Sequence, residues 1–216
     1  MNKEKGVSYI LVSVLSFIVL CIEFILAYLI EPIVYNKTMH EWSDSQYITH
    51  WTLTCIIWGI GISLIYSYSK NKLDFNFLKR GPRMNRKGYI LIIIAVIVSF
   101  CVSYYEWNGI KIIIEYTNLG FIKFIYQYIY YACEVMLFML ILIFGQKACE
   151  IWFKKKEIPY GGVIVAVSWG ASHFLSKDII TGIFSMLAGF IFGSVYLLTN
   201  RDGRKTYNIF FLIFIL

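Results

Sequence analysis

The chain has 216 residues, of which 59% are hydrophobic and only 15% are charged. A soluble domain of this length carries about 25% charged residues and about 45–50% apolar ones, so a water-soluble fold could not bury this much apolar surface. The composition therefore predicts an all-α, polytopic transmembrane helix bundle. Because no linker or low-complexity tract divides the sequence, residues 1–216 are expected to form a single membrane domain.

Runs of apolar residues predict about six or seven membrane spans. A bilayer core of about 30 Å needs about 20 apolar residues in a helix. Five segments meet this requirement, at about 9–30, 48–68, 88–105, 120–144 and 178–199. A sixth apolar segment, 160–176, is interrupted by Trp169, Ser172 and His173. The last run, 207–216, is too short to cross alone, so it could be a half-span, an interfacial tail or part of a longer chain.

The basic residues predict the orientation of these spans. Sixteen of the 20 Lys and Arg residues precede the first span or follow the segments 48–68, 120–144 and 178–199, which are the second, fourth and sixth in chain order. Such alternation is typical of loops on the cytoplasmic side, so we expect a multi-pass protein of the cell membrane with a cytoplasmic N-terminus. The net charge of +7 is explained by this topology and by contact with anionic lipids, and a nucleic-acid partner is not expected. The Ile-, Phe-, Tyr- and Lys-rich composition favours a bacterial source.

Ionisable residues inside spans need a reason, since a charge at the helix centre costs about 2.5–3.5 kcal/mol on insertion scales. Glu134 lies in the middle of the fourth span, and Gln127 and Tyr131 share its helix face at i, i+4, i+7 spacing. Two interpretations stay open: a protonated carboxyl that hydrogen-bonds a neighbouring helix, or a general base that takes a proton from water in a polar cavity. Glu23, in the first span, is expected to snorkel or to make a single interhelical hydrogen bond.

His173 is the second candidate. Trp169 and His173 are four residues apart, as are Ser168 and Ser172, so each pair shares a helix face. His173 could be a packing residue or could line a polar cavity near one membrane face. Two glycines of the next span, in the pattern Gly189-xxx-Gly193, predict a close approach between helices there.

Residues 158–196 resemble the core of the CAAX-protease and bacteriocin-processing family of intramembrane proteases, also called the Abi family, and the likeness extends over about 120–199. Trp169-xxx-His173 stands for the FxxxH motif of that family, and Gly189, Gly193 and Tyr196 match its next, Gly-rich helix. Of the family's Glu-Glu-xxx-Arg motif this chain offers Glu134 alone. Of the last motif, HxxxN or HxxxD, only Asn208 could stand in for any part.

The resemblance implies an intramembrane peptidase in which Glu134 activates water and His173 is the electrophilic or orienting partner. Its substrate would be a membrane peptide or the C-terminus of a lipidated or bacteriocin-type precursor. The residues expected to line the cavity or to contact substrate are Gln127, Tyr131, Trp169, Ser172 and Asn208. A divalent metal such as zinc is suggested by the resemblance alone. The residues themselves do not argue for it, because a zinc site usually needs three protein ligands and only Glu134 and His173 are candidates.

Two other functions stay open at this point. An inactive relative of the same fold would bind a membrane peptide as a scaffold, immunity or regulatory factor, and the absent motifs favour this alternative. A small transporter or channel subunit would be expected to contain internal repeats or paired broken helices, and no convincing repeat is present.

Overall fold

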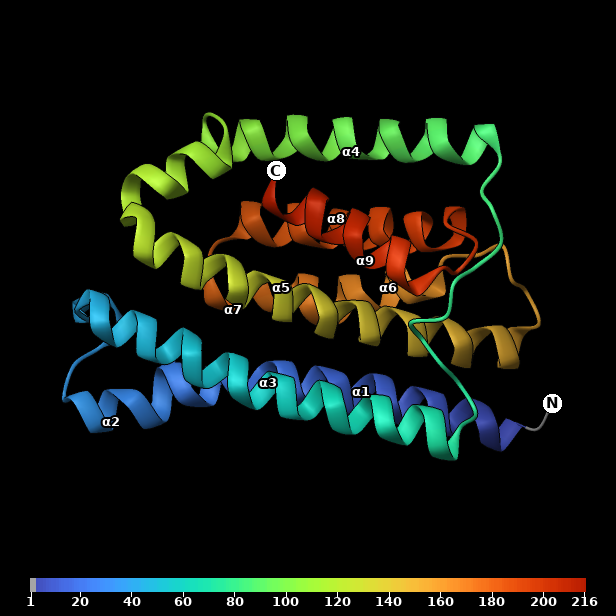
Figure 1. The fold of residues 1–216 in the computed structure, drawn as a ribbon, viewed down its shortest axis with the longest axis horizontal. Helices are drawn as coiled ribbons and strands as arrows, with labels where there is room; N and C mark the ends of the chain where they lie inside the picture. Colours follow the sequence, from blue (N-terminus) through green and yellow to red (C-terminus); the bar gives the residue numbers. More distant parts are fainter. Residues whose placement is uncertain (1–2) are drawn as a thin grey trace.

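The computed structural model describes residues 3–216, which form helices and connecting loops and contain no β-strand (Figure 1). The all-α prediction is therefore confirmed. Within residues 3–216, five helical segments are long and apolar enough to cross a membrane. The first, Lys3–Tyr35, joins α1 (Lys3–Ile25), the π-helix η1 (Leu26–Ile30) and α2 (Glu31–Tyr35). The others are α3 (Asp44–Lys72), α4 (Arg86–Trp107), α5 (Lys111–Phe153) and α8 (Ile179–Leu198).

The two remaining predicted segments are helical but shorter. The apolar segment 160–176 forms α6 (Tyr160–Val165), the π-helix η3 (Ala166–Gly170) and α7 (Ala171–Ser176). The last run lies in α9 (Gly203–Ile215), whose 13 residues reach about 20 Å, less than the bilayer core. The structure therefore offers five candidate spans of full length, fewer than the six or seven expected. A short 3₁₀ turn, η2 (Met39–Glu41), lies between α2 and α3.

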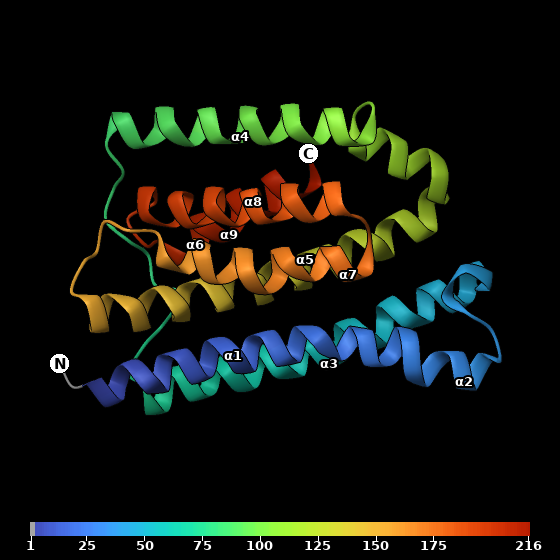
Figure 2. The same ribbon diagram turned by 180° about the vertical axis from the view of Figure 1, so that it is seen from behind.

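The helices pack around α5. On one side α1 and α3 form a hairpin, and on the other α6, η3 and α7 pair with α8 (Figures 1 and 2). Helix α4 lies outside α8, and α9 packs against α5. Residues 135–145 of α5 carry no polar side chain, and residues 137–144 are buried. A helix that is hydrophobic all round belongs in the core of a bundle, so its position follows from its sequence.

The connections that carry most of the basic residues meet at one end of the bundle. The described N-terminal residues and the α3–α4, α5–α6 and α8–α9 connections lie at this basic end (Figures 1 and 2). The α4–α5 and α7–α8 connections lie toward the opposite end. This is the arrangement of loops that the alternating charges predicted.

Three irregularities interrupt the helices, and each lies near the polar residues described below. Gly120 has φ +70° and divides α5 into a short first segment and a long second one. This region of backbone conformation is easily reached by glycine, which has no Cβ to clash. The other two irregularities are the π-helical turns η1 and η3. Such turns are rare and are frequently found at functional sites.

Candidate functional site

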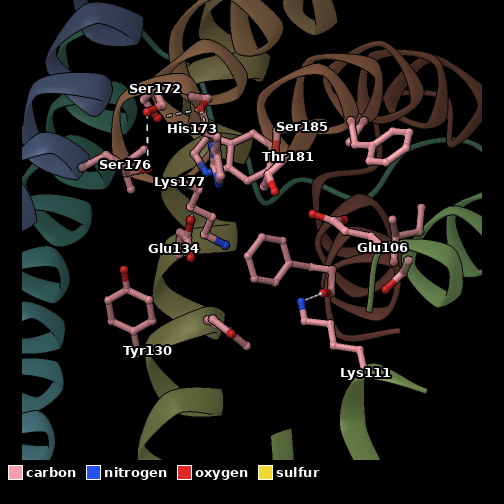
Figure 3. A pocket seen from close by; sticks show the side chains of 18 of the residues that line it. Glu106, Lys111, Tyr130, Glu134, Ser172, His173, Ser176, Lys177, Thr181 and Ser185 are labelled. Carbon is pink, nitrogen blue, oxygen red and sulfur yellow. Dashed lines mark hydrogen bonds between the residues drawn. The ribbon is translucent and has the colours of Figure 1, made fainter. Parts of the chain in front are cut away.

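A cavity of about 490 Å³ lies among the helices (Figure 3), and its lining includes Trp107 and Lys111 at the two ends of the α4–α5 connection, which is opposite the basic end. Its walls come from α1, η1, α3, α4, α5, α7, α8 and α9, with one residue each from η2, η3 and the α7–α8 connection. Six of the seven residues expected at the site line it: Gln127, Tyr131, Glu134, Trp169, Ser172 and His173. The prediction that α5 and segment 160–176 contribute to one polar cavity is therefore consistent with this geometry.

Trp169 connects the two proposed catalytic residues. Its indole Nε1 donates a 2.9 Å hydrogen bond to Oε1 of Glu134, which fixes one carboxyl oxygen. The Trp169 and His173 rings are 4.7 Å apart, centroid to centroid, in an edge-to-face arrangement. Trp169 itself is buried against Phe138 and Phe192. Glu134 and His173 are thus both positioned by one buried indole.

The backbone of Trp169 also orients His173. Nδ1 of His173 is 2.9 Å from the Trp169 carbonyl oxygen, and the hydroxyl of Ser172 donates to the same oxygen at 2.7 Å. A carbonyl can only accept, so Nδ1 carries the hydrogen in this contact. In a neutral imidazole Nε2 is then the acceptor. The ring can therefore accept a hydrogen bond or a proton at Nε2.

Gln127 and Tyr131 line the cavity, but their polar contacts are with Glu115 rather than with Glu134. The Tyr131 and Tyr128 hydroxyls donate to Glu115 at 2.6 and 2.8 Å, and Nε2 of Gln127 donates at 3.1 Å. Gln127 also hydrogen-bonds the Tyr131 hydroxyl. The bend at Gly120 folds the start of α5 back so that the buried Glu115 reaches these groups. The sequence spacing identified the helix face but gave no sign of this partner.

Two lysines extend into the cavity, and no motif in the sequence predicts a role for either. The Lys111 ammonium donates a 2.7 Å hydrogen bond to the Phe214 carbonyl and lies 4.7–5.7 Å from the ring centroids of Phe214, Tyr131 and Trp107. This ammonium is therefore already engaged by protein groups. Lys177 reaches from the end of α7 into the cavity, toward Glu134 (Figure 3). It offers positive charge near the carboxyl group.

Asn208 does not belong to the site. It is exposed on α9 and does not line the cavity, so the expectation that it contributes there is wrong. The buried face of α9 is formed by Thr206, Phe210 and Ile213, at i, i+4, i+7 spacing. Asn208 lies about 160° from Phe210 around the helix axis, so it points away from the bundle.

The described residues do not fit a metal centre. Within residues 3–216 no group of three His, Cys, Asp or Glu side chains is placed to hold a metal ion. Of the three histidines, His173 alone lines the cavity, while His40 is exposed and His50 is buried beside Glu31. A catalytic zinc usually has three protein ligands, so the metal suggested by the family resemblance lacks a ligand set here.

Glu23 and Glu106 are two further acids that line the cavity. Glu23 was expected only to snorkel or to make one interhelical hydrogen bond, but its carboxylate lies 4.0 Å from His50 on α3.

Comparison with family models, curated proteins and solved structures gives no match for this chain. The interpretation of the site therefore rests on the geometry of this cavity and on the resemblance in motifs.

Proposed function

We propose that the protein is a multi-pass protein of the bacterial cell membrane, with the basic end of the bundle in the cytoplasm. The five long apolar helices and the clustering of basic connections at one end support this topology. Reporter fusions after α3, α4 and α5 test it. A cytoplasmic signal after α3 and α5 and an outside signal after α4 are expected, and the reverse pattern would contradict the proposed orientation.

We propose further that the cavity hydrolyses a peptide bond, as in the CAAX-protease and bacteriocin-processing family. The observation that carries this proposal is the hydrogen bond from Trp169 to Glu134 beside His173 in a polar intramembrane cavity. A carboxylate fixed at one oxygen is suited to act as a general base through the other. The substrate class is a membrane-associated peptide, including the C-terminus of a lipidated or bacteriocin-type precursor.

In the proposed reaction Glu134 takes a proton from a water molecule whose oxygen adds to the carbonyl carbon of the peptide. The carbonyl oxygen gains negative charge, which the Lys177 ammonium can stabilise, while Nε2 of the neutral His173 can accept a hydrogen bond from the attacking water. When the tetrahedral intermediate collapses, the C–N bond breaks and Glu134 passes its proton to the leaving nitrogen. Every proton is thus returned, and no step requires a metal.

An inactive, peptide-binding relative is the second candidate. The observation that favours it is the incomplete motif set, since no second histidine lines the cavity and Asn208 points away from it. Such a protein would use the same cavity to hold a membrane peptide as a scaffold, immunity or regulatory factor. The two candidates differ in one measurable property, which is turnover.

The deciding experiment is cleavage of a quenched fluorescent peptide library by detergent-purified protein. Wild type is compared with Glu134→Gln and His173→Ala, and Asn208→Ala serves as a control because Asn208 is polar and outside the cavity. Loss of a single general base typically reduces the rate by about 10²–10⁴-fold. Turnover that falls in both cavity variants and not in the control supports the peptidase.

Two results would overturn the peptidase proposal. One is the absence of turnover in wild-type protein that is folded by thermal melt. The other is turnover that persists in both variants. Saturable binding of library peptides without cleavage, weakened by either cavity substitution, would support the binding protein instead.

A further inference from the structure

A second polar cluster lies beside the cavity, at the contact of α1, α2 and α3. His50 on α3 is fully buried, and its Nδ1 is 2.6 Å from Oε2 of Glu31. On the other side of the ring, Nε2 is 4.0 Å from Oε1 of Glu23. Glu31 is also buried, whereas the Glu23 side chain is 24% exposed and lines the cavity. One imidazole therefore lies between a buried carboxyl and a carboxyl that faces the cavity.

The π-helical turn η1 explains how both carboxyls face the same histidine. Glu23 and Glu31 are eight residues apart, which in a regular α-helix rotates them about 80° from one another. The turn Leu26–Ile30 lies between them, and a π-bulge adds one residue to its turn. Glu23 and Glu31 are then placed like residues i and i+7 of a regular helix, whose side chains differ by only about 20° around the helix axis. The irregular turn thus presents both acids to α3.

Several polar atoms of this cluster are buried without a partner. They are Nε2 of His50, Oε1 of Glu31 and the hydroxyl of Thr54, which is one turn beyond His50 on α3. Buried polar groups are usually hydrogen-bonded, because an unmade bond is costly. A purely structural ion pair would be expected to satisfy both nitrogens of the ring. The unpartnered Nε2 lies on the side of the cavity-lining Glu23.

We propose that Glu23, His50 and Glu31 form a proton relay that exchanges a proton between the cavity and the buried carboxyl of Glu31. Glu23 takes a proton from the cavity and passes it to Nε2 of His50, after a change of rotamer or through one bridging water. The Nδ1 proton moves at the same time to Oε2 of Glu31. One proton enters the ring and one leaves it, so the imidazole ends in its other neutral tautomer and Glu31 holds the proton.

The surroundings suit such a relay. The acidic groups facing His50 are Glu31 and Glu23, from α2 and α1. From α5, Tyr130 and Glu134 line the cavity with Glu23, and Lys177 and Lys111 supply its positive charge. The indole of Trp42 packs beside the imidazole, with the ring centroids 5.4 Å apart. The cavity beside Glu23 is therefore the side from which a proton would enter the relay.

The relay does not depend on peptide hydrolysis, so its test uses the ring itself. Protein labelled with ¹⁵N-histidine is placed in lipid nanodiscs, and the His50 nitrogen signals are assigned by their loss in His50→Gln. Their chemical shifts are then followed with pH. In wild type we expect the two ring nitrogens to shift in opposite directions in one common transition, because the protonated and unprotonated nitrogens exchange roles, whereas formation of an imidazolium would make both nitrogens alike. In Glu23→Gln that transition should be lost.

Glu106→Gln is the matched control, because it makes the same chemical change in the same cavity from α4. It should keep the wild-type transition. If the ring nitrogens of wild-type protein do not shift with pH, the relay is overturned. This result comes from wild-type protein alone, so it does not depend on whether any variant folds. A Glu23→Gln protein with the wild-type transition would also overturn it. Loss of the transition in Glu106→Gln as well would show that only the charge of the cavity matters, which contradicts a role for Glu23.

Discussion

The indole nitrogen of Trp169 lies 2.9 Å from a carboxyl oxygen of Glu134 and joins the π-helical turn η3 to the centre of α5. Trp169 also contacts His173 through its ring and through its carbonyl oxygen. One residue therefore positions both candidate catalytic groups. Its substitution should affect stability and function through a single lost hydrogen bond.

Trp169→Phe removes the donor and keeps an aromatic ring against Phe138 and Phe192. We expect the free energy of unfolding to fall by about 1–3 kcal/mol, because the partly buried Glu134 loses its indole partner. SDS titration in mixed micelles measures this. Trp152→Phe is the control, since the Trp152 indole makes only a 3.4 Å bond in an exposed position. Equal losses in the two variants would contradict a special role for the Trp169 bond.

The close approach of α6 and η3 to α8 gives a second prediction. A Cβ at Gly189 would come within 2.7 Å of the backbone nitrogen of Ala166, whereas a Cβ at Gly59 on α3 would meet nothing within 4 Å. Gly189→Ala should therefore destabilise the protein by about 1–3 kcal/mol through overpacking. Gly59→Ala should be neutral or stabilising by up to about 1 kcal/mol, because alanine favours the helix. Thermal melts of both variants make the comparison, and a neutral Gly189→Ala would show that the two helices can move apart freely.

Hydropathy and residue spacing predicted much of this fold from sequence, because long apolar runs in lipid must be helical. They located Glu134 and His173, and the Gly189-xxx-Gly193 pattern indicated a close approach that the structure confirms. Periodicity describes the faces of one helix at a time. It could not show which face of α9 is buried, so Asn208 was assigned wrongly.

The remaining contacts depend on irregular backbone. Glu115 reaches Tyr131 because α5 bends at Gly120, and Glu31 reaches His50 beyond the π-helical turn η1. A regular 3.6-residue period misplaces residues on the far side of such features. Glu23 and His50 are also distant in sequence, and only the packing of α1 against α3 brings them together.

An ion pair between the buried Glu150 and the partly exposed Arg201, near the basic end, gives a third prediction. The Arg201 Nη2 and Nε donate to Oε1 of Glu150 at 2.7 and 3.1 Å, and Gln146 donates to the same oxygen at 2.9 Å. Arg201→Met leaves the buried Glu150 with fewer donors, so the free energy of unfolding should fall by about 1–3 kcal/mol. Arg204→Met, on an exposed residue nearby, is the matched control. A double-mutant cycle with Glu150→Gln should show coupling, and additive effects would contradict the pair.

Asp178 gives a prediction about pH. It lies in the loop before α8 and accepts hydrogen bonds from the backbone nitrogen and hydroxyl of Thr181, at 2.9 and 2.7 Å. These bonds, the backbone one first, hold the pKa of the Asp178 carboxyl below its ordinary value of 3.8. A lowered pKa means that the ionised cap stabilises the folded state above the unfolded value. This contribution is lost as the pH falls through the folded pKa.

The measurement is hydrogen exchange of the Thr181 amide, corrected for the intrinsic dependence of exchange on pH. In wild type, protection should be complete near neutral pH and should decrease on acidification below the ordinary carboxyl value. Asp178→Asn should show no such step, because asparagine caps helices about as well as aspartate and does not titrate. Asp178→Ala should lack the protection at every pH. An identical acid step in Asp178→Asn would assign the titration to a different group and contradict the prediction.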